Sequence, residues 1–196
     1  MAKRGLNKEY IIDAAETLVV EKGYENFSLR EVAAKLEVKP ASLYNHVQGL
    51  DEINIAVALR AAEKMKQALQ EAVEGKEPDE AFAEGVRAYR RFAMLNPELY
   101  KAFVRIPLLN DREVTHVAFR SFSPMRKVIN SYGLTKTQNI HFTRGLRAFM
   151  HGFIELTSNG FMQKKDISRD ETYEVIIAEQ LRQLKQKSVE SKEAQS

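Results

Sequence analysis

The stretch Val38–Val47, with the sequence VKPASLYNHV, decides how the first fifty residues of this chain are interpreted. It follows a short segment with helical apolar spacing, SLREVAAKL, and only three of its side chains are suited to packing: Val38, Leu43 and Val47. The other positions are small or polar, apart from one tyrosine. A helix this short buries only a single narrow stripe. Its outer side here is built mainly from small residues and residues that can hydrogen-bond. That outer surface needs a physical explanation.

The residues around this stretch predict two further helices. Apolar residues at helical spacing predict a helix over residues 7–22, and Gly23 suits the conformation that closes it. Ser28 and Glu31 stand at the spacing of a capping box, which predicts the start of a second helix. Pro40 fits the first position of a third helix, because its missing N–H is not needed there. We therefore expect three helices within residues 1–50.

The rest of the 196-residue chain also has helical periodicity, and no segment alternates with the period of two that a strand needs. We expect further helices over residues 51–73, 79–95, 97–104, 111–132, 135–159 and 169–187. Pro124 should kink or split the helix that contains it. A second capping box, TKTQ, begins at Thr135. The polar segment 188–196 is expected to fray. The sequence predicts an all-α protein.

Three helices, the second and third joined by a tight turn, match the helix-turn-helix plan. In that plan the third helix lies in the DNA major groove. The small residues Ala41 and Ser42 suit close approach to base edges, and Asn45 suits pairing with adenine. Tyr44 and His46 have the reach to hydrogen-bond phosphates. The alternative is a three-helix bundle whose short helix is a linker, with Tyr44 half-buried.

The stretch IIDAAETLVVEKGYENFSLREVAAKLEVKPASLYNHVQGLDEI resembles the N-terminal DNA-binding domain of the TetR family of bacterial transcriptional regulators. The resemblance spans roughly residues 6–55. The segment RAFMHGFIELTSNGFM (Arg147–Met162) is similar to the family's C-terminal domain variety named after a Trp-His-Gly motif, with Met150 in place of the Trp. The resemblance implies a helix-turn-helix domain over residues 1–50. A long helix then leads into a helical effector-binding and dimerisation bundle over 51–187, and a polar tail covers 188–196.

The resemblance also implies which side chains contact DNA: Ser28, Arg30, Lys39, Pro40, Ala41, Ser42, Tyr44, Asn45 and His46. Ser28 would contact a phosphate and Arg30 a base or a phosphate. Three positions depart from the family pattern. The turn usually has Gly where this chain has Glu37, the third helix often has a Ser or Thr cap where Lys39 stands, and a phosphate-contacting Lys is replaced by Leu50. The N–H groups of the fourth helix are the remaining candidates to hold that phosphate.

Charge alone does not demand a polyanionic partner. The formal net charge is +3, the isoelectric point is about 9.0, and residues 1–50 contain seven Lys or Arg and seven Asp or Glu. Binding to DNA therefore requires segregation of charge. We expect one set of cations to face DNA, namely Lys3, Arg4, Arg30, Lys35 and Lys39, with Lys3 and Arg4 as a flexible arm. The carboxylates of Asp13, Glu16 and Glu21 should lie elsewhere, and binding should weaken steeply with salt.

One helix-turn-helix unit contacts few base pairs, so we expect a homodimer on a palindromic site in double-stranded DNA. The interface is expected on the last two helices, from two sets of residues: small Gly145, Ala148 and Gly152, and apolar Ile177, Leu181 and Leu184. Packing inside one subunit is the alternative for both sets. A polar row on the first of these helices contains Arg144, Arg147, His151 and Glu155. We expect an unidentified small-molecule effector to contact Arg147, His151, Phe92 and Phe149, although a solvated polar face and ordinary core are the alternatives.

Other functional classes fit less well. The chain has no Cys, no G-x-S-x-G, no phosphate-binding glycine loop and no H-E-x-x-H, and its four histidines are scattered. An enzyme is therefore not expected, nor is a cofactor or a metal. A polar N-terminus and the lack of a long apolar run favour a cytoplasmic protein with no membrane contact. The rival that is hardest to exclude is a helix-turn-helix interaction or architectural protein without effector control.

Overall fold

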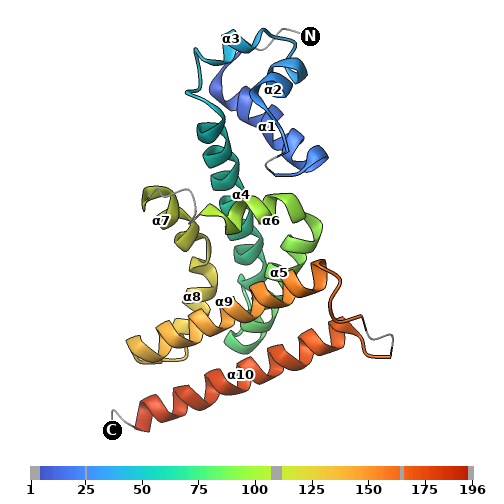
Figure 1. Ribbon diagram of the computed structural model, residues 1–196. Helices are drawn as coiled ribbons and strands as arrows, with labels where there is room; N and C mark the ends of the chain where they lie inside the picture. Colours follow the sequence, from blue (N-terminus) through green and yellow to red (C-terminus); the bar gives the residue numbers. More distant parts are fainter. Residues whose placement is uncertain (1–4, 25, 107–111, 164–165, 194–196) are drawn as a thin grey trace. The chain divides into compact units, whose positions relative to one another are not determined.

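The computed structural model describes residues 5–24, 26–106, 112–163 and 166–193, and its regular elements over these residues are helices (Figure 1). The all-α prediction is confirmed. In chain order the elements are α1 (Lys8–Lys22), α2 (Leu29–Lys35), α3 (Pro40–Leu43), α4 (Leu50–Val73), α5 (Pro78–Leu95), α6 (Pro97–Val104), α7 (Arg112–Ser121), α8 (Ser123–Asn130), α9 (Lys136–Ser158) and α10 (Arg169–Glu193).

The helix boundaries follow the local signals in the sequence. Both capping boxes are formed: the N–H of Glu31 donates to Ser28 Oγ at 3.3 Å, and the N–H of Gln138 donates to Thr135 Oγ1 at the same distance. Pro124 splits the predicted 111–132 helix, because it stands in the first turn of α8, where its missing N–H costs nothing.

The chain forms two compact units. The first comprises residues 1–64 and 95–121, and the second comprises 65–94 and 122–196. The first unit is larger than the 1–50 domain expected from the sequence, because part of α4, together with α6 and α7, belongs to it. A partly buried hydrogen bond joins α6 to the segment after α1: the Tyr24 N–H donates to Glu98 Oε2 at 2.8 Å. Burial alone would raise the pKa of Glu98, but hydrogen bonds from Lys101 and from the Tyr24 N–H hold it below its ordinary value.

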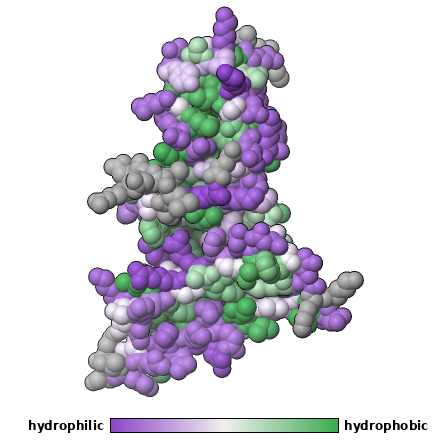
Figure 2. All heavy atoms as spheres, in the orientation of Figure 1, coloured by the Kyte–Doolittle hydropathy of each residue, from purple (hydrophilic) through white to green (hydrophobic). Residues whose placement is uncertain are grey.

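Within the second unit α9 and α10 run antiparallel and pack on each other (Figure 1). Its core contains Phe82, Leu146, Met150 and Tyr173, all buried. Gly85 of α5 lets Met125 approach closely, since a Cβ at that position would lie 2.0 Å from Met125 Sδ. Apolar side chains also reach the surface among polar ones over α9 and α10 (Figure 2).

The end of α10 differs from its prediction. The helix continues to Glu193, and Ser188 and Ser191 are buried. The Ser188 hydroxyl donates to the backbone oxygen of Tyr132, and Ser191 Oγ donates to Gln138 Oε1 at 2.6 Å. The expectation of a frayed tail from residue 188 is therefore wrong as far as Glu193. The expectation rested on the polarity of this segment. These serines are nevertheless buried, because their hydroxyls hydrogen-bond to groups far away in the sequence.

The carboxylate of Asp79 at the start of α5 joins three segments of the second unit. Its Oδ1 accepts from the Tyr132 hydroxyl at 2.7 Å, and its Oδ2 pairs with Lys185 of α10 at 2.8 Å. The bonds from Lys185 and Tyr132 lower the pKa of Asp79 below its ordinary value. The carboxylate therefore stabilises the fold in its ionised form.

We predict that Asp79→Asn lowers the free energy of unfolding at pH 7 by about 1 kcal/mol, the size of one exposed ion pair and one hydrogen bond. Because the folded-state pKa is depressed, this stabilisation is present above the unfolded pKa of about 4 and is lost as the pH falls through the folded value. Urea unfolding at pH 7 and at about pH 3 measures the difference. Glu77→Gln, an exposed carboxylate in the preceding loop, should show no such difference. An Asp79→Asn cost that is equal at both pH values would contradict the role of the charge.

Candidate nucleic-acid interface

The third helix presents the surface that its sequence suggests. Leu43 and Val47 are buried, whereas Ala41, Asn45 and His46 are exposed and Ser42 is half-exposed. Tyr44 is 60% exposed, so it lies outside the core. The linker alternative, with a half-buried Tyr44, does not describe this arrangement. α3 itself ends at Leu43, and Tyr44, Asn45 and His46 lie in the turn that follows it. Small and polar side chains of α3 and of this turn are therefore exposed on one side, and the apolar stripe is buried on the other.

The turn before α3 is closed by backbone hydrogen bonds alone. The Glu37 N–H donates to the Ala34 oxygen at 3.1 Å, and the Val38 N–H donates to the Ala33 oxygen at 3.0 Å. This is a Schellman motif, and it places Glu37 at the left-handed position with φ of 56°. Glycine normally takes this conformation, and a side chain there costs about 1 kcal/mol. The departure from the family's Gly therefore leaves the turn intact but strained.

Most cations of the described residues 5–64 are neutralised within the protein. Lys8 pairs with Glu52, Lys22 with Glu31 at 2.5 Å, and Lys64 with Glu16. These lysines are engaged by carboxylates of their own chain.

Two further cations of this region are also engaged. Lys35 pairs with Glu21 at 2.9 Å, so the expected segregation of Lys35 from the carboxylate of Glu21 is wrong. Arg60 of α4 bonds Glu9 at 2.5 Å and Asp13 at 2.6 Å on α1.

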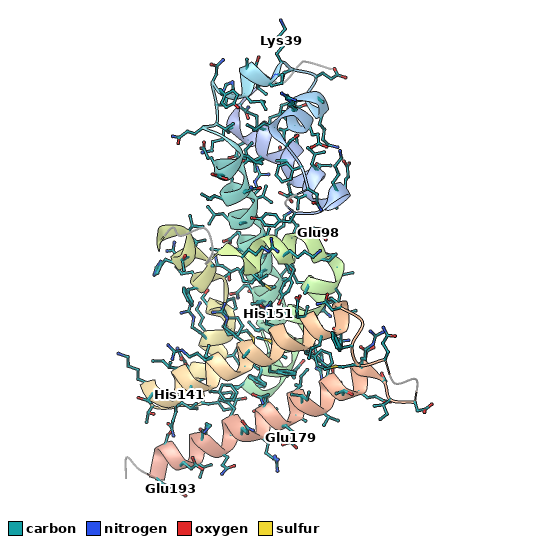
Figure 3. The ribbon with its side chains drawn as sticks, in the orientation of Figure 1. Lys39, Glu98, His141, His151, Glu179 and Glu193 are labelled. Carbon is teal, nitrogen blue, oxygen red and sulfur yellow. The ribbon has the colours of Figure 1, made fainter. Side chains whose placement is uncertain are left out.

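Two cations in this part of the chain have no ion pair among the described residues, and both are candidate DNA contacts. Arg30 lies on α2 and Lys39 caps α3. Both are exposed, and Lys39 points outward beyond α3 (Figure 3). Pro40 is exposed beside it, and Ser28 is half-exposed at the start of α2. Lys3 and Arg4, the expected arm, lie outside the described residues.

The start of α4 is already hydrogen-bonded by its own acidic side chain. The N–H of Gln48 donates to Glu52 Oε2 at 2.6 Å. Lys8 and this backbone N–H lower the pKa of Glu52 below its ordinary value, so its carboxylate is charged there. A phosphate at the N-terminus of α4 would have to approach beside this negative charge.

The four effector-contact candidates do not share one environment. Phe92 is buried in the core, and His151 is exposed on α9. The Arg147 guanidinium lies 5.7 Å from the centre of the Phe122 ring. Phe149 stacks on Tyr173 at 5.4 Å between ring centres.

Around Phe149 the structure adds Arg90, which the sequence did not single out, to the aromatic side chains of α9 and α10. The Arg90 guanidinium lies 4.8 Å from the Tyr173 ring and 5.3 Å from the Phe153 ring, and it pairs with Asp170 at 2.5 Å. Burial raises the pKa of the Tyr173 hydroxyl, which donates to the Val86 oxygen at 3.0 Å. No local pattern predicts this cluster, because its members come from three helices.

The candidate subunit-contact residues divide into two groups. Gly145 and Ala148 are exposed on α9, and Gly152 is half-exposed, so this stripe is accessible. Ile177 and Leu184 of α10 are 2% and 0% exposed. The structure therefore places Ile177 and Leu184 in the core of their own chain and corrects their assignment to a subunit contact. Leu181 lies between them, half-buried.

Comparisons with known proteins agree with this geometry. The model of bacterial regulatory proteins of the tetR family matches residues 11–52, and a tetracyclin repressor-like C-terminal domain matches residues 82–180. The HTH-type transcriptional regulator YobS of Bacillus subtilis (strain 168) is 32% identical over 166 residues, covering 83% of this chain and 85% of YobS. In the described residues no helix is both long enough and apolar enough to span a bilayer.

Solved structures share the fold. Apo ActR from Streptomyces coelicolor superposes with a TM-score of 0.72 at 18% identity, covering 96% of this chain and 99% of that one. A TetR variant from Acinetobacter baumannii AYE, in complex with minocycline, superposes with a TM-score of 0.67 at 15% identity, covering 92% and 97%. The sequence relative and the two family models, together with a helix-turn-helix whose third helix is exposed, show that this chain belongs to the TetR family of DNA-binding transcriptional regulators.

Proposed function

We propose that the protein is a homodimeric repressor that binds a palindromic operator and leaves it when a small-molecule effector binds. The observation that carries this proposal is the distribution of charge around α3. Arg30 and Lys39, which lack an internal ion pair among the described residues, stand beside the exposed small and polar side chains of α3. Cations left free at such a surface are available to phosphates.

The proposed contacts divide by chemistry. Ser42 and Asn45 have the donors and acceptors for base edges, and Ala41 and Pro40 leave room for close approach. Lys39 lies with this group at the groove. Tyr44, His46 and Ser28 supply hydrogen bonds for the DNA backbone, and Arg30 supplies a cation for a base or a phosphate. The first group sets sequence preference and the second sets affinity for any duplex.

A second copy of the chain makes this small surface selective. We place the subunit contact on the exposed stripe of α9, where Gly145, Ala148 and Gly152 allow close approach of a partner helix. Two exposed apolar side chains, Leu156 of α9 and Val175 of α10, add apolar area that packing of a partner would remove from water. Two third helices held about 34 Å apart would then enter successive major grooves.

Release by an effector requires that binding in the second unit changes the first, and α4 is the proposed link because it contributes residues to both units. Its residues up to 64 belong to the first unit and the following ones to the second. Arg60 and Lys64 tie its first part to the carboxylates of α1. A ligand that favours one position of α4 would therefore change DNA affinity, provided that it binds the two states unequally.

The proposed effector contacts remain Arg147, His151, Phe149 and Phe92, but these residues do not line one preformed site, because His151 is exposed and Phe92 is buried in the core. A ligand that reaches all four requires a rearrangement of the second unit. That the minocycline complex of the A. baumannii TetR variant has this fold supports a small-molecule ligand here. Release of the protein from its operator by a small molecule distinguishes this function from the alternative of a helix-turn-helix architectural protein, which no ligand would displace.

We predict that Tyr44→Ala weakens binding to all duplexes by about tenfold, the loss of one phosphate hydrogen bond, without changing the preferred sequence. Ser42→Ala and Asn45→Ala should instead relax preference at one position of each half-site. Selection from random DNA, followed by fluorescence anisotropy on the selected site, measures both effects. Tyr10→Ala, an exposed tyrosine on α1, is the matched control and should leave binding unchanged. Silence of all three variants would show that α3 and the turn after it do not contact DNA.

We predict that Ala148→Arg converts the dimer to a monomer, because a long charged side chain cannot enter a contact built on small residues. Size-exclusion chromatography with light scattering should show about half the wild-type mass, and affinity for a full palindrome should fall by at least about 100-fold, toward that of one half-site. Gln70→Arg adds the same side chain at an exposed position of α4 and should remain dimeric. A dimeric Ala148→Arg protein would move the contact away from α9.

A further inference from the structure

Glu37, in the turn between α2 and α3, combines two unfavourable features. Its backbone has φ of 56°, a conformation that side chains other than Asn and Asp rarely adopt. Its carboxylate is exposed and has neither an ion pair nor a hydrogen bond among the described residues. A residue held in a strained conformation at a binding surface is an indication of a functional role for its side chain.

The charges nearby make the position more unusual. Among the described residues 5–64, Glu37 and Asp51 are the carboxylates without an ion pair or hydrogen bond, since the others are engaged by other groups of the chain. Asp51 lies in the first turn of α4, where the helix dipole favours an acid. Glu37 follows the end of α2, where the dipole disfavours one.

Glu37 also lies next to the expected point of entry into the groove. It precedes Lys39, the N-cap of α3, by two residues, so their Cα atoms are at most about 7.6 Å apart along the chain. Lys39 points outward beyond α3 (Figure 3). A carboxylate at the edge of the groove is repelled by phosphates and by the acceptor atoms of guanine and thymine. The partner that attracts it is an amino group on a base edge.

We propose that Glu37 is a specificity-determining residue whose carboxylate accepts a hydrogen bond from the N4 amino group of a cytosine in each operator half-site. Cytosine fits better than adenine, because adenine places the N7 acceptor beside its amino group and would repel the second carboxylate oxygen. The same charge acts against the other bases, so it lowers affinity for wrong sequences more than it raises affinity for the right one. This inference rests on the proposed contact of α3 with DNA.

The test is selection from random DNA with the full-length protein and two variants. Glu37→Gln keeps the strained backbone and removes the charge, whereas Glu37→Gly removes both. The wild-type motif should contain one cytosine per half-site, with about tenfold discrimination against other bases that falls to near one in Glu37→Gly. Glu37→Gln should weaken this discrimination, because its amide oxygen still accepts from cytosine N4 while its NH₂ group also donates to the acceptors of guanine and thymine. The rest of the motif should stay the same. Asp51→Asn, which neutralises the other unpaired carboxylate, is the control and should preserve the cytosine.

Thermal unfolding separates the side chain from the backbone. Glu37→Gly should unfold at a higher temperature than wild type, since glycine relieves the strain, and Glu37→Gln should not. A change of preference shared by both variants then arises from the lost carboxylate. Identical motifs for all proteins, or uniformly tighter binding of both variants to every sequence, would overturn the inference and leave α3 as the DNA-binding helix. A wild-type protein that selects no motif would overturn the proposed function as well.

Discussion

The burial of Leu43 and Val47 is the constraint on which the exposed surface around α3 depends. A helix of four residues has too few internal hydrogen bonds to persist in water, so its shape is imposed by packing of this stripe and by the closed turn before it. Once these two side chains are fixed, the positions between them have no freedom to turn inward. Tyr44 and Asn45, which lie between these two buried residues, are exposed for this reason, and Ala41, two residues before Leu43, is exposed as well. The exposed surface is a consequence of what is buried behind it.

Charge around this surface is organised by pairing and not by composition. Residues 1–50 are electrically balanced, yet most of the cations described there are held by carboxylates of the same unit. The pairs are exposed, so each contributes little to stability. Their larger effect is to decide which charges remain available to a partner. Arg30 and Lys39 remain so because no carboxylate of the described residues reaches them, and a nearly neutral domain can still present a locally cationic edge.

The sequence predicted the elements well and the tertiary contacts poorly, for physical reasons. Caps, prolines and apolar spacing act within a few residues, so the two capping boxes and the break at Pro124 were predictable. The burial of Ser188 and Ser191 was not, because it depends on acceptors more than fifty residues away. For the same reason an apolar face on α10 did not reveal whether Ile177 and Leu184 pack inside the chain or against another. The pairing of Lys35 with Glu21 likewise joins two helices that no local pattern relates.

The proposed role of Glu37 sets a loss of folding stability in the α2–α3 turn against a gain in DNA sequence selectivity. Any residue other than glycine at position 37 costs folding free energy, and a glutamate adds repulsion from every phosphate nearby. Neither cost depends on the DNA sequence, whereas the proposed hydrogen bond from a cytosine amino group to the carboxylate of Glu37 would form on one sequence only. A regulator must find few sites among many competing ones, so discrimination matters more to it than tight binding to each duplex it meets. A locally cationic edge supplied by Arg30 and Lys39 would then provide affinity for any duplex, and the acid at position 37 would provide discrimination.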